Sequence, residues 1–293
     1  MSIALQVALV MVTILVVLLV IGAPIGVAIG MSSAVSMICM IPADVSFATS
    51  AQRIFAGSNS FSLIAIPFFI LAGNIMNNGG IATRLVNCAK VISGRMPGAL
   101  AQSNVVANML FGAISGSGAA AAAAMGGTIG PLEEKEGYDK NYSTAVNVAS
   151  APVGMLIPPS NTMIVYSSVA GSVSIAALFM AGYIPGLLWG GAVMILAGIM
   201  AKKRGYQAEQ RVPVKVALKT FWQAIPSLLL IVIVIGGILG GIFTATEGSA
   251  IAVVYATVLS LIYKAFKIKD IPRIVLEAVS YTHLRAHETR HDL

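Results

Sequence analysis

The chain has 293 residues, of which 57% are hydrophobic and 10% are charged, and its mean hydropathy is +0.89. This composition excludes an ordinary soluble domain, in which about 25% of the residues are charged. The long uncharged runs hold several times the roughly 20 residues that one helical crossing needs, so they predict an all-α polytopic membrane protein. The net charge of +7 does not indicate a nucleic-acid partner, because the basic residues lie in the short connections between apolar runs.

Apolar runs bounded by turn residues and charges mark the membrane crossings. The first run, Ile3–Gly22, lacks the pattern of a cleaved signal peptide, so we expect a retained helix. Residues 210–223, which carry two lysines and a Phe-Trp pair, predict a helix on the cytoplasmic membrane surface. The predicted crossings are 3–22, 24–41, 60–78, 140–171, 174–201, 224–243 and 245–263.

The basic residues also predict the topology. If Lys202–Arg204 is cytoplasmic, only Arg53 of the 18 basic residues falls on the outer side, leaving aside Arg285 and Arg290 near the end of the chain. This asymmetry follows the positive-inside rule. It predicts a multi-pass membrane protein whose N-terminus lies on the outer side of the membrane.

Residues 96–132 carry no charge, and Glu133 is the next charged residue. The predicted topology requires this segment to begin and end on the same side of the membrane. Two full crossings and a turn need more than about 40 residues, so the segment predicts a re-entrant helical hairpin. Its tip is the run Ser115, Gly116, Ser117 and Gly118. Non-helical backbone at membrane depth must be buried in protein or line a wet cavity, so the tip predicts a binding site, with a mere kink as the alternative.

A second interruption lies in the run GMLIPPSNTMIVYSS, residues 154–168. A proline has no N–H and clashes with the preceding turn, so two in a row break a helix and free the carbonyls before them. Hydroxyl and amide oxygens follow at once and also suit a helix cap. The alternative is a capped, kinked helix with nothing bound. The candidate ligand residues of this break are Gly154, Met155, Pro158, Pro159, Ser160, Asn161 and Thr162.

Together, the two breaks resemble the discontinuous-helix sites of secondary transporters. Neither contains an acidic residue, which favours Na⁺ held by neutral oxygens over a carboxylate proton relay. No catalytic residue, cofactor or other metal is predicted. An ion channel with a re-entrant filter is an alternative. An intramembrane protease built on Ser117 is another, although its base would have to come from the last thirteen residues, which hold all three histidines.

In several blocks the chain resembles the large membrane subunit, the dicarboxylate-type large permease, of tripartite ATP-independent periplasmic (TRAP) transporters. The resemblance extends over essentially residues 1–280. The family's hairpin tip corresponds to Ser115–Gly118 and its helix break to Pro158–Asn161, although the family more often has an apolar residue at Asn161. The matching blocks are SFSLIAIPFFILAGNIMNNGGI, LFGAISGSGAAAAAAMGGTIGP, EGYDKNYSTAVNVASAPVGMLIPPSNTMIVYSSVAG, FMAGYIPGLLWG and GGIFTATEGSAIAVVYA.

The resemblance implies Na⁺-driven, elevator-like import of a small organic anion, such as a C4-dicarboxylate or a sugar acid. It implies two partners, a small membrane subunit and a periplasmic substrate-binding protein. It also implies that the chain is a permease and not an enzyme. The expected segments are scaffold helices over 1–93, a transport half-domain over 94–205, a surface helix and the start of a second repeat over 206–280, and a foreign tail over 281–293.

The end of the chain departs from the family, whose second inverted half has its own hairpin and Pro-Pro break. We therefore expect a C-terminally truncated chain that is inactive alone. His283, His287 and His291 share one face if the tail is helical, which is the pattern of a metal site. The abrupt change in composition favours a foreign or misread terminus instead. Glu247 is expected to cap a helix, with an intramembrane functional carboxylate as the alternative.

Overall fold

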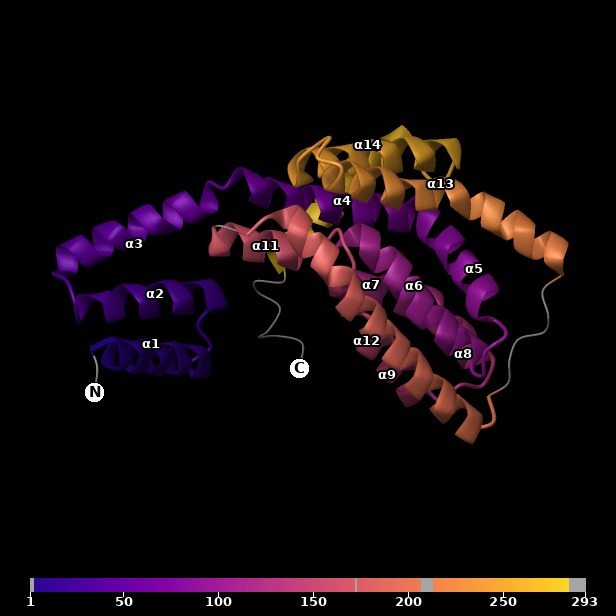
Figure 1. Cartoon of the computed structure of the whole chain (residues 1–293), viewed down its shortest axis with the longest axis horizontal. Helices are drawn as coiled ribbons and strands as arrows, with labels where there is room; N and C mark the ends of the chain where they lie inside the picture. The colour runs from indigo at the N-terminus through magenta and orange to yellow at the C-terminus, as the bar shows by residue number, and fades with distance from the viewer. Residues whose placement is uncertain (1–2, 172, 207–212, 285–293) are drawn as a thin grey trace. The chain divides into compact units, whose positions relative to one another are not determined.

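The computed structural model describes residues 3–171, 173–206 and 213–284 (Figure 1). This part of the chain is helical and contains no β-strand. Short 3₁₀ turns lie at Phe61–Ile64 and Ile268–Asp270. The helices are Ile3–Val20 (α1), Ile25–Ile38 (α2), Ala43–Ser58 (α3), Ala65–Asn78 (α4), Ile81–Ser93 (α5), Ala99–Ser115 (α6), Gly118–Thr128 (α7), Gly130–Lys135 (α8), Lys140–Ser150 (α9), Val153–Leu156 (α10), Asn161–Ala170 (α11), Ile175–Lys203 (α12), Val214–Leu239 (α13), Ala245–Ile262 (α14) and Ile271–Leu284 (α15).

The chain forms two compact units, residues 1–60 with 279–293 and residues 61–278. In the first unit, α1 packs on α2 and α2 packs on α3. The Ser46 hydroxyl donates to the Ala34 carbonyl at 2.8 Å and ties α3 to α2. Helix α1 has no buried residue, so its apolar surface is available to lipid. The predicted segment boundaries at residues 93 and 205 stay predictions.

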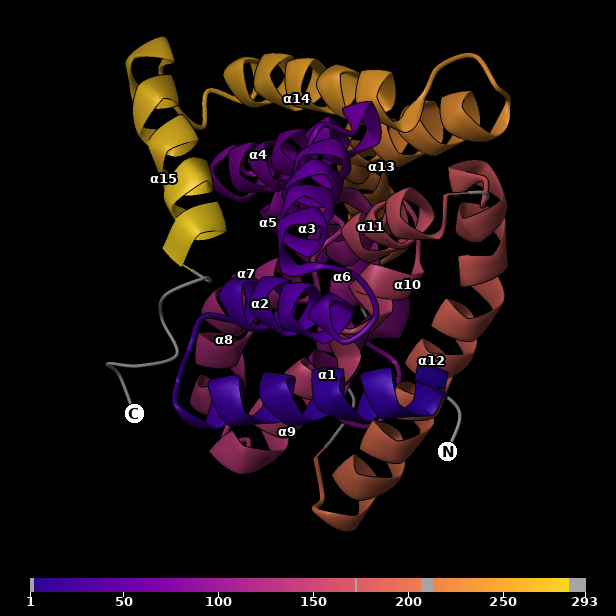
Figure 2. The same ribbon diagram turned by 90° about the vertical axis from the view of Figure 1, so that its left-hand side faces the viewer.

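In the second unit, α4 packs against α14 and α6, and α5 packs against α6 and α13. Figure 2, a view turned by 90° from that of Figure 1, shows α14 lying along α4. Phe69, Leu85, Phe111 and Leu230 come from four of these helices and are at most 1% exposed. This apolar core surrounds α6, the first arm of the predicted hairpin.

Helix α12 fastens the hairpin to the broken helix. Figure 1 shows α6, α9 and α12 running beside one another. The Gln102 amide of α6 donates to the Met194 carbonyl at 2.8 Å. The Tyr142 hydroxyl of α9 donates to the Ala197 carbonyl, also at 2.8 Å. Because both carbonyls belong to α12, the three helices form one polar-linked bundle.

In the described part of the chain, five helices are long and apolar enough to span a membrane, or there are six spans if the bent pair of α9–α10 and α11 counts as one. This confirms the polytopic all-α class. The predicted crossing 24–41 is shorter than expected, because α2 has 14 residues, about 21 Å, against a bilayer core of about 30 Å. Helix α3, which follows it, was not predicted.

The prediction of a separate surface helix over 210–223 is wrong for the residues of this range that the structure describes. From Val214 onward these residues belong to α13, which continues through the predicted crossing to Leu239. The physical reason is that neither glycine nor proline interrupts residues 214–225, so the helix propagates into the apolar run. Pro226 lies inside α13, and its carbonyl accepts a hydrogen bond from the Tyr255 hydroxyl at 2.8 Å.

Helix α14 begins at a capping box. The Thr244 hydroxyl accepts from the Glu247 amide, and the Glu247 carboxylate accepts from the Thr244 amide at 2.7 Å. Two unpaired amides of the first turn are satisfied in this way. The capping role expected for Glu247 is confirmed.

Replacing Thr244 with alanine should therefore lower the free energy of unfolding by about 1 kcal/mol. Denaturant unfolding in detergent micelles, followed by circular dichroism, measures this change. Thr257→Ala is the matched control, because the Thr257 hydroxyl only donates to Val253 within the same helix. Equal losses in the two variants would contradict the capping account.

Candidate functional site

The hairpin tip is a two-residue link between α6 and α7. Gly116 ends α6 with φ +61°, a left-handed conformation that favours glycine, and its amide donates to the Gly112 carbonyl at 2.8 Å. Ser117 is extended, and its hydroxyl accepts from the Ala120 amide at 3.3 Å, which caps α7. The predicted interruption at Ser115–Gly118 is confirmed as a helix–turn–helix.

The second break separates α9 and α10 from α11, with a bend of 46°. Ile157 is extended, and the Pro158–Pro159 peptide bond is cis. The Ser160 hydroxyl accepts from the Met163 amide and so caps α11. The predicted break is confirmed.

The two breaks meet. The Asn161 backbone amide donates to the Gly116 carbonyl at 3.2 Å, and its side-chain amide lies 3.5 Å from the Ser115 carbonyl. A Cβ placed on Gly116 would lie 3.1 Å from the Pro159 carbonyl oxygen. The tip and the break therefore form one junction of non-helical backbone.

Glycines make this approach possible. A Cβ on Gly154 would lie 2.6 Å from the Gly112 Cα, and a Cβ on Gly112 would overlap the Gly154 Cα. A Cβ on Gly118 would lie 2.9 Å from the Ala151 carbonyl oxygen. Separations of this kind leave no room for a side chain, so α6 and α7 contact the broken helix through backbone.

The junction is buried and rich in oxygen. Ser115 is 1% exposed and Ser160 is 0% exposed. The Asn161 side-chain oxygen is buried and has no hydrogen-bond partner among the described residues. Helices α7 and α11 both begin here, and helix N-termini carry partial positive charge. The arrangement offers carbonyl, hydroxyl and amide oxygens to a cation and two helix ends to an anion.

Not every predicted ligand is free at the junction. The Met155 carbonyl was expected to lack a partner, which is wrong: it accepts a hydrogen bond from the Ser160 hydroxyl at 2.5 Å. The reason is that Ser160 lies five residues beyond Met155, at the N-cap of α11, where the chain has bent by 46°. The Thr162 side chain is exposed, and no described contact joins it to the tip. Pro158 is buried beside Pro159.

Sequence reasoning missed a polar network that links α6, α7 and α9. The Asn108 side-chain amide on α6 lies within 3.0 Å of the side-chain oxygens of Asn104, Asn147 and Ser150. The Asn147 amide in turn donates to the Ala122 carbonyl on α7 at 2.9 Å. The available signal was the spacing of Asn104 and Asn108, which share one face of a helix at i and i+4.

Sequence reasoning also gave no role to Glu133, the first charge after the uncharged run 96–132, yet Glu133 is only 1% exposed. It lies on α8 and lines the same pocket as Asn104 and Asn147. No pattern in the charged run GPLEEKEGY distinguishes it from the exposed Glu134. The described residues hold no cluster of acid, cysteine and histidine side chains suited to a metal ion. The predicted histidine cluster falls mostly in 285–293, outside the described residues.

Comparison with known proteins decides the family. The profile of the tripartite ATP-independent periplasmic transporter DctM component matches residues 12–284. The chain belongs to this family. It is 52% identical to the uncharacterized protein YgiK of Salmonella typhimurium over 85% of the chain. It is 44% identical to the isethionate TRAP transporter permease protein DctMQ of Oleidesulfovibrio alaskensis over 71% of the chain.

The chain is also 39% identical, over 85% of its length, to the C4-dicarboxylate TRAP transporter large permease protein DctM of Vibrio cholerae. It covers 57% of YgiK, 33% of DctMQ and 56% of this DctM protein. The DctM-family chain thus spans little more than half the length of two of these relatives. The inferred resemblance to the TRAP large permease family is confirmed.

Proposed function

We propose that this DctM-family chain is part of the permease of a Na⁺-coupled secondary transporter, and that the junction of tip and break holds the coupling ion. The observation that carries the proposal is the contact between Asn161 and Gly116, which places two interruptions of helical backbone against each other. The proposed ligand groups are neutral oxygens around Ser115, Ser117, Ser160 and Asn161. Hard monovalent cations bind such oxygens, and neither of the two segments that form the junction contains an acidic residue.

The proposed cargo is a small organic anion. The relatives named for C4-dicarboxylate and isethionate support a carboxylate or sulfonate of a few carbons. The N-termini of α7 and α11 supply the positive partial charge that such a group requires. Elevator-like movement of the bundle that contains α6, α9 and α12 is proposed as the means of transport.

The proposed partners are a small membrane subunit and a periplasmic substrate-binding protein. The DctMQ relative supports the first, because its name joins the M and Q components in one permease protein. We place the chain in the bacterial inner membrane with its N-terminus in the periplasm, following the distribution of basic residues. We expect no transport by the 293-residue chain alone, since the matched permeases are much longer.

Uptake of succinate into proteoliposomes tests the proposal. The liposomes contain the assembled transporter with and without its binding protein, in Na⁺ or choline buffer. Ser117→Leu and Ser160→Leu should each abolish the Na⁺ dependence, because leucine removes an oxygen from the junction and fills its space. Ser168→Leu on α11 is the matched control, because the Ser168 hydroxyl only donates to Ile164 of the same helix.

Uptake that remains Na⁺-dependent in both junction variants would contradict the proposed ion site. Flux that needs no binding protein would instead support a channel, which conducts without delivery of substrate.

A further inference from the structure

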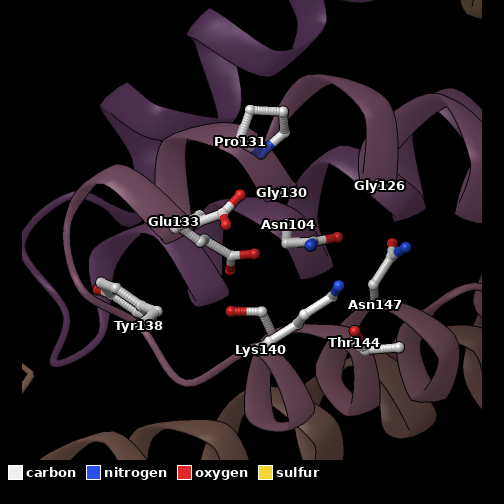
Figure 3. A pocket seen from close by; sticks show the side chains of 11 residues that line it. Asn104, Gly126, Gly130, Pro131, Glu133, Tyr138, Lys140, Thr144 and Asn147 are labelled. Carbon is white, nitrogen blue, oxygen red and sulfur yellow. The ribbon is translucent and has the colours of Figure 1, made fainter.

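A cavity of about 360 Å³ lies at the base of the hairpin, away from the junction. Figure 3 shows Glu133, Asn104, Lys140 and Asn147 around it. Its wall is built by α6, α7, α8 and α9 and by the loop that holds Tyr138. A polar space of this size admits several water molecules. Nothing in the proposed transport site uses it.

Glu133 is the buried acid of this cavity. Neither of its carboxyl oxygens has a hydrogen-bond partner among the described residues. The Asn104 side-chain nitrogen and the Ser143 hydroxyl are likewise buried and without partners. An ionised carboxylate left in this condition costs several kcal/mol, so a group that neutralises it has a strong reason to bind.

The two neighbouring groups suit the carboxyl in both of its protonation states. A small rotation of these side chains would let an ionised Glu133 accept from the Asn104 amide and from the Ser143 hydroxyl. A protonated Glu133 would accept from Asn104 through one oxygen and donate to Ser143 through the other, because a hydroxyl is both donor and acceptor. The chemistry of the two groups therefore matches the carboxyl with and without its proton.

The charges that face Glu133 do not neutralise it. Lys140 on α9 lines the cavity, yet within the described residues no ion pair joins it to Glu133. Glu134 of the same helix and the Tyr138 phenol also line the space. Helices α6 and α7 contribute no titratable side chain to the wall. Burial raises the pKa of Glu133 to about 7, Ser143 and Asn104 lower it, and Glu136 raises it.

We propose that this cavity is a proton-binding site, in which Glu133 takes up and releases H⁺ while the hairpin stays folded and Asn104 and Ser143 hold the carboxyl in both states. The proton is the ligand, and cavity water carries it to the surface. The charge of the hairpin base then changes near neutral pH. This inference does not depend on the identity of the coupling ion at the junction.

Infrared difference spectroscopy of the purified chain in lipid nanodiscs tests the proposal. The spectrum recorded between pH 8.5 and pH 6 should show the C=O stretch of a newly protonated carboxyl. Glu133→Gln should remove this band. Glu134→Gln, which alters an exposed carboxylate on the same helix, should retain it.

Ser143→Ala provides a second test that does not depend on the folding of Glu133→Gln. It removes the Ser143 hydroxyl, whose net effect is to lower the pKa of Glu133, so the midpoint of the band should move to higher pH. An identical band in wild type and Glu133→Gln would overturn the proposal. A carboxylate that stays ionised at pH 6 and shifts its bands when Na⁺ replaces choline would also overturn it, in favour of a metal-ion site.

Discussion

Gly154→Val is expected to lower the free energy of unfolding by about 3 kcal/mol and to remove any stabilisation by Na⁺. The Gly154 Cα lies so close to Gly112 that even a single Cβ would meet backbone at 2.6 Å. Backbone cannot move aside as a flexible side chain does, so the broken helix must shift away from α6. The shift separates Asn161 from Gly116 and opens the junction.

Denaturant unfolding in micelles, with Na⁺ or choline as the cation, measures both effects. Gly127→Ala is a suitable control, because a Cβ on this helical glycine of α7 would meet nothing within 4 Å. It should be neutral or stabilising by up to about 1 kcal/mol, through helix propensity. A Gly154→Val protein that is as stable as wild type would show that the close backbone contact is not present in the molecule.

Glu133→Gln is expected to stabilise the chain at alkaline pH and not in acid. The folded pKa of about 7 lies above the ordinary value of 4.5. Below pH 4.5 the carboxyl is protonated in both states and contributes nothing. Between the two values the unfolded chain has lost the proton that the folded chain keeps, so wild-type stability falls as the pH rises. Above pH 7 the penalty is constant, at about 3 kcal/mol.

Glutamine is neutral at every pH and escapes this penalty. The difference in unfolding free energy between Glu133→Gln and wild type should therefore grow from pH 4.5 to pH 7 and then level off. Unfolding in micelles across pH 4–9 measures it, with Glu134→Gln as the control. A difference that is independent of pH, or that shrinks toward alkaline pH, would contradict a carboxyl held neutral by burial.

The local interruptions could be predicted from the sequence because their causes are local. Gly116 adopts a conformation that favours glycine, and the paired prolines at 158 and 159 cannot continue a helix. The Asn161 contact with Gly116 joins residues 45 positions apart. The sequence does not predict this contact itself; it predicts only that the two breaks belong to one site.

The remainder depends on packing that no local pattern records. Glu133 and Glu134 are neighbours in one charged run, yet only the first is buried, because α8 turns one face toward α6 and α9. The extent of α13 was mispredicted for a related reason: the polar residues before the apolar run suggested a separate element, whereas helix propagation continues across them. The Met155 carbonyl was expected to be free because the sequence shows only that the prolines remove its helical partner. It does not show that the Ser160 hydroxyl, five residues on, takes that partner's place.

The most direct measurement of the central claim is the effect of Na⁺ on the unfolding midpoint of the purified chain. If the junction of Gly116 and Asn161 binds Na⁺, the midpoint rises with Na⁺ concentration and saturates, as it must for a ligand that binds the folded state only. Choline at the same ionic strength gives no rise, and Asn161→Leu abolishes the response. Equal midpoints in Na⁺ and choline, or an Na⁺ response that survives in Asn161→Leu, would contradict the account.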